Sequence, residues 1–138
     1  MNSATGVGRG VARVCYAGRM TKAGGISIHV FDVSNGIAAA GLRVELRGPD
    51  GKALASGAIN AAGVLDHPTV RGEGLTATGI YEAIFHIGEW YRARGAPIPH
   101  PAFLEAVPYR FGVADLAQHY HLPLKMTPWG FSLFRGGA

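Results

Sequence analysis

The sequence has little of what marks several common classes of protein. Cysteine occurs once in 138 residues, at Cys15, so an internal disulfide framework is excluded. No stretch approaches the roughly 18 consecutive apolar residues of a membrane-spanning helix. A glycine-rich phosphate loop and a nucleophile elbow are also missing. We therefore expect a cytoplasmic protein that does not associate with a membrane.

Acidic residues are absent from the first 24 positions, whereas four basic residues there account for the whole formal net charge of +4: Arg9, Arg13, Arg19 and Lys22. The rest of the chain carries nine basic and nine acidic residues, so it has no excess positive charge to follow a phosphate backbone. We therefore expect no nucleic-acid partner. We predict a flexible basic leader over 1–24, for which a targeting role stays open, and a single domain over 25–138.

Turn-forming residues are abundant, with 21 glycines and 8 prolines. Between them, short segments alternate apolar and polar residues with the period of two that is typical of half-buried strands. Strands at intervals near ten residues in a chain of one-domain length favour an all-β sandwich. We predict strands over 26–33, 42–47, 53–59, 80–87, 107–113, 120–126 and 131–134, a weaker edge strand over 64–70, and one short helix over 89–94.

Histidines offer the clearest candidate chemistry. In the first expected strand, His29 shares a face with Ser27 and Phe31, while the other face is apolar. His119 and His121 are two residues apart on another expected strand, so their imidazoles point to the same side. A neutral imidazole can take a proton from water near neutral pH. If His29 reaches the same cleft, three titratable rings converge there.

Two other interpretations of these histidines stay open. A His-x-His pair with a third histidine can bind zinc and generate hydroxide. The sequence offers no nearby cysteine and no convincing acidic group to complete or orient that site, so we predict no metal. A histidine bonded to backbone inside a sandwich core needs no catalytic role. The other histidines, His67, His86 and His100, lie in loops or at strand positions without a polar companion, and we expect them to be structural or on the surface.

The C-terminal segment ends with a cation followed by small residues. The planar guanidinium of Arg135 is suited to hold an oxyanion or an acidic heterocycle. Gly136 lets backbone amides approach a ligand closely. A solvated terminal arginine is the alternative interpretation.

Three segments resemble the 5-hydroxyisourate hydrolases, which are transthyretin-like proteins of purine catabolism. They are the strand around His29 with the following turn and 41–46, the HYHLPL segment 119–124, and the FRGG segment 134–137. The resemblance extends over about 25–137. It implies a transthyretin-like sandwich of two four-stranded sheets with one short helix. It also implies a homotetramer, a dimer of dimers, whose active clefts form where subunits meet.

The resemblance further implies that His29 and His121 are catalytic imidazoles, and that His119, Arg135 and Gly136 contact the substrate. Two places depart from the family pattern. Val64 stands where the family has an arginine that would bind an anionic substrate. In addition, the family's tyrosine and terminal serine are replaced here by Phe134 and Gly137. Arg47 or Arg71 is a candidate to supply the missing cation.

The resemblance therefore implies a hydrolase without a cofactor, in which histidines drive water into a small planar heterocycle. Because both histidines and Arg135 are retained, altered specificity explains the departures better than loss of function does. We expect the substrate to be a cyclic amide, imide or lactone, with Val64 among the residues that contact it. A catalytically silent protein that binds small molecules is the main alternative, and a metal-dependent enzyme is a further one.

Overall fold

A computed structural model describes residues 24–137. The predicted leader therefore lies outside the described residues, except for Gly24. The elements along the described chain are β2 (Ile26–Asp32), β3 (Ile37–Ala38), β4 (Arg43–Arg47), β5 (Ala53–Ala58), the 3-10 helix η2 (Pro68–Arg71), β6 (Gly79–Phe85), α1 (Ile87–Ala93), β7 (Val107–Val113), β8 (Tyr120–Met126) and β9 (Phe131–Leu133).

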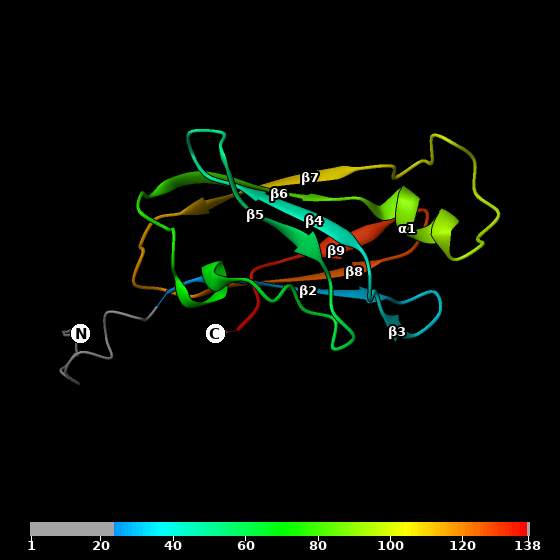
Figure 1. The fold of residues 1–138 in the computed structure, drawn as a ribbon, viewed down its shortest axis with the longest axis horizontal. Helices are drawn as coiled ribbons and strands as arrows, with labels where there is room; N and C mark the ends of the chain where they lie inside the picture. Colours follow the sequence, from blue (N-terminus) through cyan, green and yellow to red (C-terminus); the bar gives the residue numbers. More distant parts are fainter. Residues whose placement is uncertain (1–23, 138) are drawn as a thin grey trace.

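The strands form two sheets of four, in the orders β3-β2-β8-β9 and β5-β4-β6-β7. Figure 1 shows them as two stacked layers, with α1 at one end of the sandwich. The predicted all-β sandwich of two four-stranded sheets is therefore confirmed for the described residues.

The core lies between the sheets because alternation turns one side of each strand inward. In β2 the inward residues are Ile26, Ile28 and Val30, each no more than 1% exposed. β8 lies beside β2 in parallel, with Ile26 opposite Tyr120 at one end of the register. The residues between the inward ones face outward from the sandwich, and this outer face is where the candidate chemistry lies.

A buried carboxylate fixes the far end of β2. Asp32 is fully buried and accepts hydrogen bonds from the Tyr91 hydroxyl on α1 and from the side chains of Ser34 and Asn35 in the following turn. Burial by itself raises the pKa of Asp32, but these hydrogen bonds outweigh it and hold the pKa below its ordinary value. The charged carboxylate therefore ties the strand that carries His29 to α1.

The helix α1 begins at Ile87, two residues earlier than the predicted helix, and packs its buried Trp90 and Tyr91 against the sandwich. The Trp90 indole N–H donates to the Ala40 carbonyl at 2.8 Å, which satisfies the one polar atom of that ring. Within residues 24–137, no helix combines the length and the apolar composition required to cross a bilayer.

The segment 64–70 does not form the predicted edge strand. Val64 makes an isolated bridge, and η2 begins at Pro68, whose fixed φ suits the first helical position. The His67 imidazole accepts a hydrogen bond from the Thr69 N–H and so caps this short helix. The eighth strand is instead β3, whose two residues are too few to produce a periodic pattern.

Candidate active site

A row of polar side chains lies on the outer face of the β3-β2-β8-β9 sheet. Ser27 and His29 point outward from β2 because their apolar neighbours point into the core. In the parallel register, Ser27 is opposite His121 and His29 is opposite Pro123. The fold thus brings His121 beside Ser27 and close to His29, although the two histidines lie in strands at opposite ends of the domain sequence.

The imidazoles of His29 and His121 form a pair. Their ring centroids are 6.5 Å apart and the ring planes are tilted by 37°. Both residues are half-buried and so keep part of their surface accessible to solvent. No direct hydrogen bond joins the two rings among those described for residues 24–137, yet they are close enough to face one small reacting group.

Each imidazole packs against a glycine from a neighbouring segment. A Cβ atom on Gly63 would lie 2.6 Å from His29 Nε2, and the backbone of Gly63 has a φ of +90° that other residues rarely adopt. A Cβ atom on Gly136 would lie 2.8 Å from His121 Cδ2. A larger residue at either position would displace the ring, so the two glycines set where the imidazoles lie.

The Ser27 hydroxyl connects the two histidines of the His-x-His segment. Ser27 Oγ lies 2.6 Å from His121 Nδ1 and 2.8 Å from His119 Nε2. His119 Nδ1 in turn lies 2.7 Å from the Gly24 carbonyl oxygen. These contacts leave His121 Nε2 as the ring nitrogen of that residue without a protein partner among the described hydrogen bonds.

The surroundings of His121 favour its neutral form. Burial lowers the pKa of His121 below its ordinary value of 6.5, and the neighbouring imidazoles of His29 and His119 lower the pKa further. A histidine that is neutral at physiological pH has one ring nitrogen free to accept a proton. His121 is therefore in the protonation state that a general base requires.

Val64 lies directly beside His29. The two residues form an antiparallel bridge, flanked by hydrogen bonds from Val30 N–H to Gly63 O at 2.8 Å and from Leu65 N–H to Ile28 O at 3.1 Å. Side chains directly opposite each other in an antiparallel pair lie on one face. An uncharged, branched side chain therefore stands next to this imidazole, at the position where the resemblance leads one to expect an arginine.

Arg135 and Gly136 run alongside β8 next to the imidazole pair. The Arg135 guanidinium lies 4.2 Å from the centre of the Tyr120 ring and donates to Gln118 Oε1 and to the His119 carbonyl. The Gly136 N–H donates to the His121 carbonyl at 2.8 Å. In this chain the glycine thus contributes by making room for the ring of His121, since its amide is already paired within the sheet.

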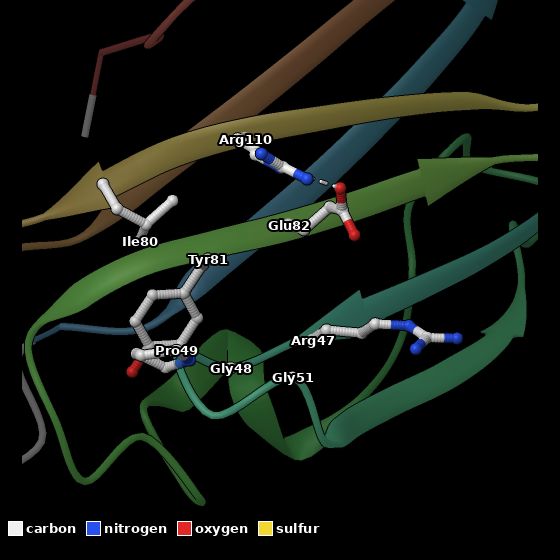
Figure 2. Close-up of a pocket in the computed structure, with 8 residues that line it drawn as sticks. All are labelled: Arg47, Gly48, Pro49, Gly51, Ile80, Tyr81, Glu82 and Arg110. Atoms are coloured by element: carbon white, nitrogen blue, oxygen red, sulfur yellow. Dashed lines mark hydrogen bonds and ion pairs between the residues drawn. The ribbon is translucent and has the colours of Figure 1, made fainter.

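A separate hollow of about 430 Å³ lies at the second sheet, around Arg47, Glu82 and Arg110, and is drawn in Figure 2. Arg47 Nη2 pairs with Glu45 at 3.1 Å, and Arg110 Nε pairs with Glu82 at 3.2 Å. Because β4 belongs to the other sheet, Arg47 does not share a sheet face with His29 and His121 within one chain. Arg71, at the end of η2, faces Glu73 at 3.8 Å.

The expectation that His86 lacks a polar companion is also wrong. His86 Nε2 lies 2.7 Å from Glu45 Oε2, because β4 and β6 pair so that the end of β6 comes beside Glu45. His100 lies 3.6 Å from Glu105. Over the part of the chain that the structure describes, no group of three or more His, Cys, Asp or Glu side chains is arranged to hold a metal ion.

Sequence reasoning placed Ser27 on the outward face of its strand but did not include it among the site residues. The alternation shows that Ser27 and His29 share a face. It does not reveal that β2 pairs in parallel with β8, which is what places the hydroxyl between His119 and His121.

Solved structures similar to this chain share its architecture. The crystal structure of (S)-allantoin synthase superposes with a TM-score of 0.75 and 33% sequence identity, over 83% of this chain. The match covers 44% of that longer chain. The Klebsiella pneumoniae 5-hydroxyisourate hydrolase superposes with a TM-score of 0.69 and 26% identity, over 83% of this chain and 99% of the other.

Curated relatives match at higher identity. The 5-hydroxyisourate hydrolase 2 of Rhizobium meliloti (strain 1021) is 43% identical over 120 residues, which is 85% of this chain and 99% of the relative. The 5-hydroxyisourate hydrolase of Pseudomonas aeruginosa is 38% identical over 123 residues, or 87% and 97% of the two chains. The sequence profile described as the HIUase/Transthyretin family matches residues 26–136, nearly the whole described domain. The chain belongs to the HIUase/Transthyretin family.

Proposed function

We propose that the protein is a hydrolase of the 5-hydroxyisourate hydrolase type, which opens a small cyclic amide, imide or lactone ring by histidine-assisted attack of water. The observation that carries this proposal is the pair of half-buried imidazoles, His29 and His121, with ring centroids 6.5 Å apart on one sheet face. The named activity of the relatives at 43% and 38% identity supports the same reaction class.

In the proposed reaction, a water molecule is held beside His121 Nε2. The imidazole takes one proton from the water as the oxygen attacks the ring carbonyl carbon. The tetrahedral intermediate then breaks its carbon–nitrogen bond, or its ring carbon–oxygen bond in a lactone, and the protonated His121 returns the proton to the departing nitrogen or oxygen. One water molecule is consumed, one ring bond is broken, and the enzyme ends in its starting protonation state.

The other site residues stabilise charge and orientation in this scheme. His29 faces the same space and is placed to donate a hydrogen bond to the carbonyl oxygen as negative charge develops there. Arg135 lies against the His119 carbonyl at the same end of β8, where a substrate anion would come within reach of its remaining N–H groups. His119 and Gly136 set the position of His121, through the Ser27 hydroxyl and by packing, respectively.

Val64 supports a change of substrate relative to the family pattern. A valine beside His29 offers no N–H donors and no charge. Unlike an arginine, it cannot replace the hydrogen bonds that an anionic substrate oxygen loses when it leaves water. We therefore propose that the preferred substrate is less anionic than 5-hydroxyisourate, or is shaped so that its charge lies away from position 64.

We also propose that the chain works as a homotetramer, a dimer of dimers, in the cytoplasm and in purine metabolism. β9 is an edge strand of its sheet, and three aromatic side chains in it or close to its two ends are exposed: Trp129 by 60%, Phe131 by 42% and Phe134 by 49%. Apolar residues along an unpaired strand edge favour pairing with another chain. In that assembly the outer face that carries His29 and His121 lies where subunits meet.

The test of this function is the pH dependence of ring opening by the full chain with freshly generated 5-hydroxyisourate and a panel of neutral cyclic imides and lactones. Because the pKa of His121 lies below 6.5, its neutral form persists into mildly acidic solution. We expect kcat/KM to be constant near neutral pH and to fall on the acid side with a midpoint below 6.5. The titratable groups that face His121 are the imidazoles of His29 and His119. Rates no faster than the uncatalysed reaction for every compound would rule the function out.

A further inference from the structure

The hydrogen bonds around Ser27 determine which nitrogen of His121 carries the proton. A carbonyl oxygen only accepts hydrogen bonds, so the contact of 2.7 Å between Gly24 O and His119 Nδ1 requires a proton on Nδ1. In a neutral imidazole the other nitrogen is then a pure acceptor. His119 Nε2 therefore accepts a hydrogen bond from the Ser27 hydroxyl at 2.8 Å.

The single hydroxyl proton of Ser27 is thereby committed to His119. The contact of 2.6 Å between Ser27 Oγ and His121 Nδ1 must then be donated by the ring, from Nδ1–H to the oxygen lone pair. A neutral His121 with its proton on Nδ1 has an unprotonated Nε2. The direction of the whole chain of hydrogen bonds thus follows from the one group that cannot donate, the Gly24 carbonyl.

The backbone conformation at Gly24 fixes its carbonyl oxygen close to the His119 ring. Gly24 has a φ of +105°, a conformation that side-chain-bearing residues rarely adopt, and a Cβ there would collide with the Leu116 carbonyl oxygen. Tyr120 N–H donates to Gly25 O at 2.8 Å, which aligns the start of β8 with this turn. The position of His119, one residue before β8, is therefore fixed by backbone contacts as well as by its own side chain.

We propose that Ser27 and His119 are positioning residues that hold His121 in the tautomer with a free Nε2, so that this nitrogen serves as the proton acceptor. This inference rests on the proposed function for its consequence in catalysis, but the tautomer itself is a property of the free protein. With neutral His119, the hydroxyl proton of Ser27 is taken up by His119 Nε2, and the contact to His121 can form only with the proton on Nδ1 of that ring.

The direct test is the imidazole nitrogen spectrum of His121 in the full-length protein labelled with ¹⁵N-histidine, recorded at about pH 8, where ordinary imidazoles are neutral. We expect the Nδ1 signal of His121 to be that of a protonated nitrogen and the Nε2 signal that of an unprotonated one. In Ser27→Ala the contact is lost, and we expect the Nε2–H form of His121 to become populated. Finding the proton on Nε2 in the unaltered protein would overturn the proposal.

A kinetic test compares Ser27→Ala with Ser27→Thr, which retains the hydroxyl. We expect kcat of Ser27→Ala to fall by about 10- to 100-fold with little change in KM. Removing the group that hydrogen-bonds the second ring nitrogen of a functional histidine typically has an effect of at least this size. Ser27→Thr should recover most of the loss. Ser56→Ala, an exposed serine-to-alanine change on β5 of the other sheet, is the matched control and should keep the original kcat.

The outcomes separate this inference from the proposed function. If His121→Ala abolishes turnover but Ser27→Ala changes neither the tautomer nor kcat, the hydrolase stands and the positioning role is wrong. If the unaltered protein opens no ring faster than the uncatalysed reaction, the proposed function fails, while the nitrogen spectrum still decides whether Ser27 sets the tautomer. A shifted tautomer in Ser27→Ala that Ser27→Thr restores shows that Ser27 sets the tautomer, and a parallel loss and recovery of kcat shows that the tautomer matters for catalysis.

Discussion

Replacing His121 by alanine is expected to lower kcat for ring opening by about 10²- to 10⁴-fold, the range typical of losing a general base. The physical reason is that His121 Nε2 is the proposed proton acceptor, while the neighbouring Ser27 hydroxyl and His119 imidazole are already engaged in hydrogen bonds with each other, with His121 and with the Gly24 carbonyl. KM should change little, since the imidazole acts mainly as the reaction proceeds. Stopped-flow absorbance of the freshly generated substrate measures both constants.

His100→Ala is the matched control for this prediction. The His100 side chain is 72% exposed, and its ring lies 3.6 Å from Glu105 rather than near the imidazole pair. This variant should retain the original kcat. Thermal unfolding of both variants checks that the domain is intact. A folded His121→Ala protein with unchanged kcat would remove His121 from the mechanism.

The second large expected effect is an increase in catalytic efficiency on the anionic substrate. Val64→Arg is expected to raise kcat/KM for 5-hydroxyisourate by about 10- to 100-fold, because one charge-assisted hydrogen bond is typically worth about 1.5 to 3 kcal/mol. The bridge to His29 places the new side chain on the face of the imidazoles, and position 64 is half-buried rather than sealed in the core. The gain should shrink as salt is added, since it depends on attraction between opposite charges.

Val64→Met is the control for side-chain length without charge, and it should show no gain on the anionic substrate. The neutral members of the substrate panel should respond in the opposite direction, with kcat/KM for Val64→Arg equal to or below that of the unaltered chain. Equal kcat/KM of the unaltered chain and Val64→Arg for 5-hydroxyisourate would mean that position 64 does not set substrate charge preference.

Much of the fold could be predicted because alternation of period two is a local property. The strands β7 and β8 begin and end where the sequence pattern places them, over 107–113 and 120–126. The pattern also gives the outward direction of His29 and the shared face of His119 and His121. Tertiary contacts were not needed for any of these conclusions.

The remaining features depend on pairing between distant segments or on single turns. The Ser27 contacts require the parallel register of β2 with β8, over a separation of 94 positions for His121, which no local pattern encodes. The predicted strand over 64–70 does not form because Pro68 and the His67 cap favour a short helix shortly after Val64 has made its bridge to β2. His86 finds Glu45 only because β6 pairs with β4.

The central claim is that His29 and His121 act together on one reacting group. The measurement that tests this most directly is a double-mutant cycle of kcat for His29→Ala, His121→Ala and the double variant on the best substrate of the panel. We predict strong coupling, with the double variant losing about as much as His121→Ala alone, because groups that serve one reaction step are not additive. Losses that multiply, or a double variant as active as the original chain, would contradict a shared site on this sheet face.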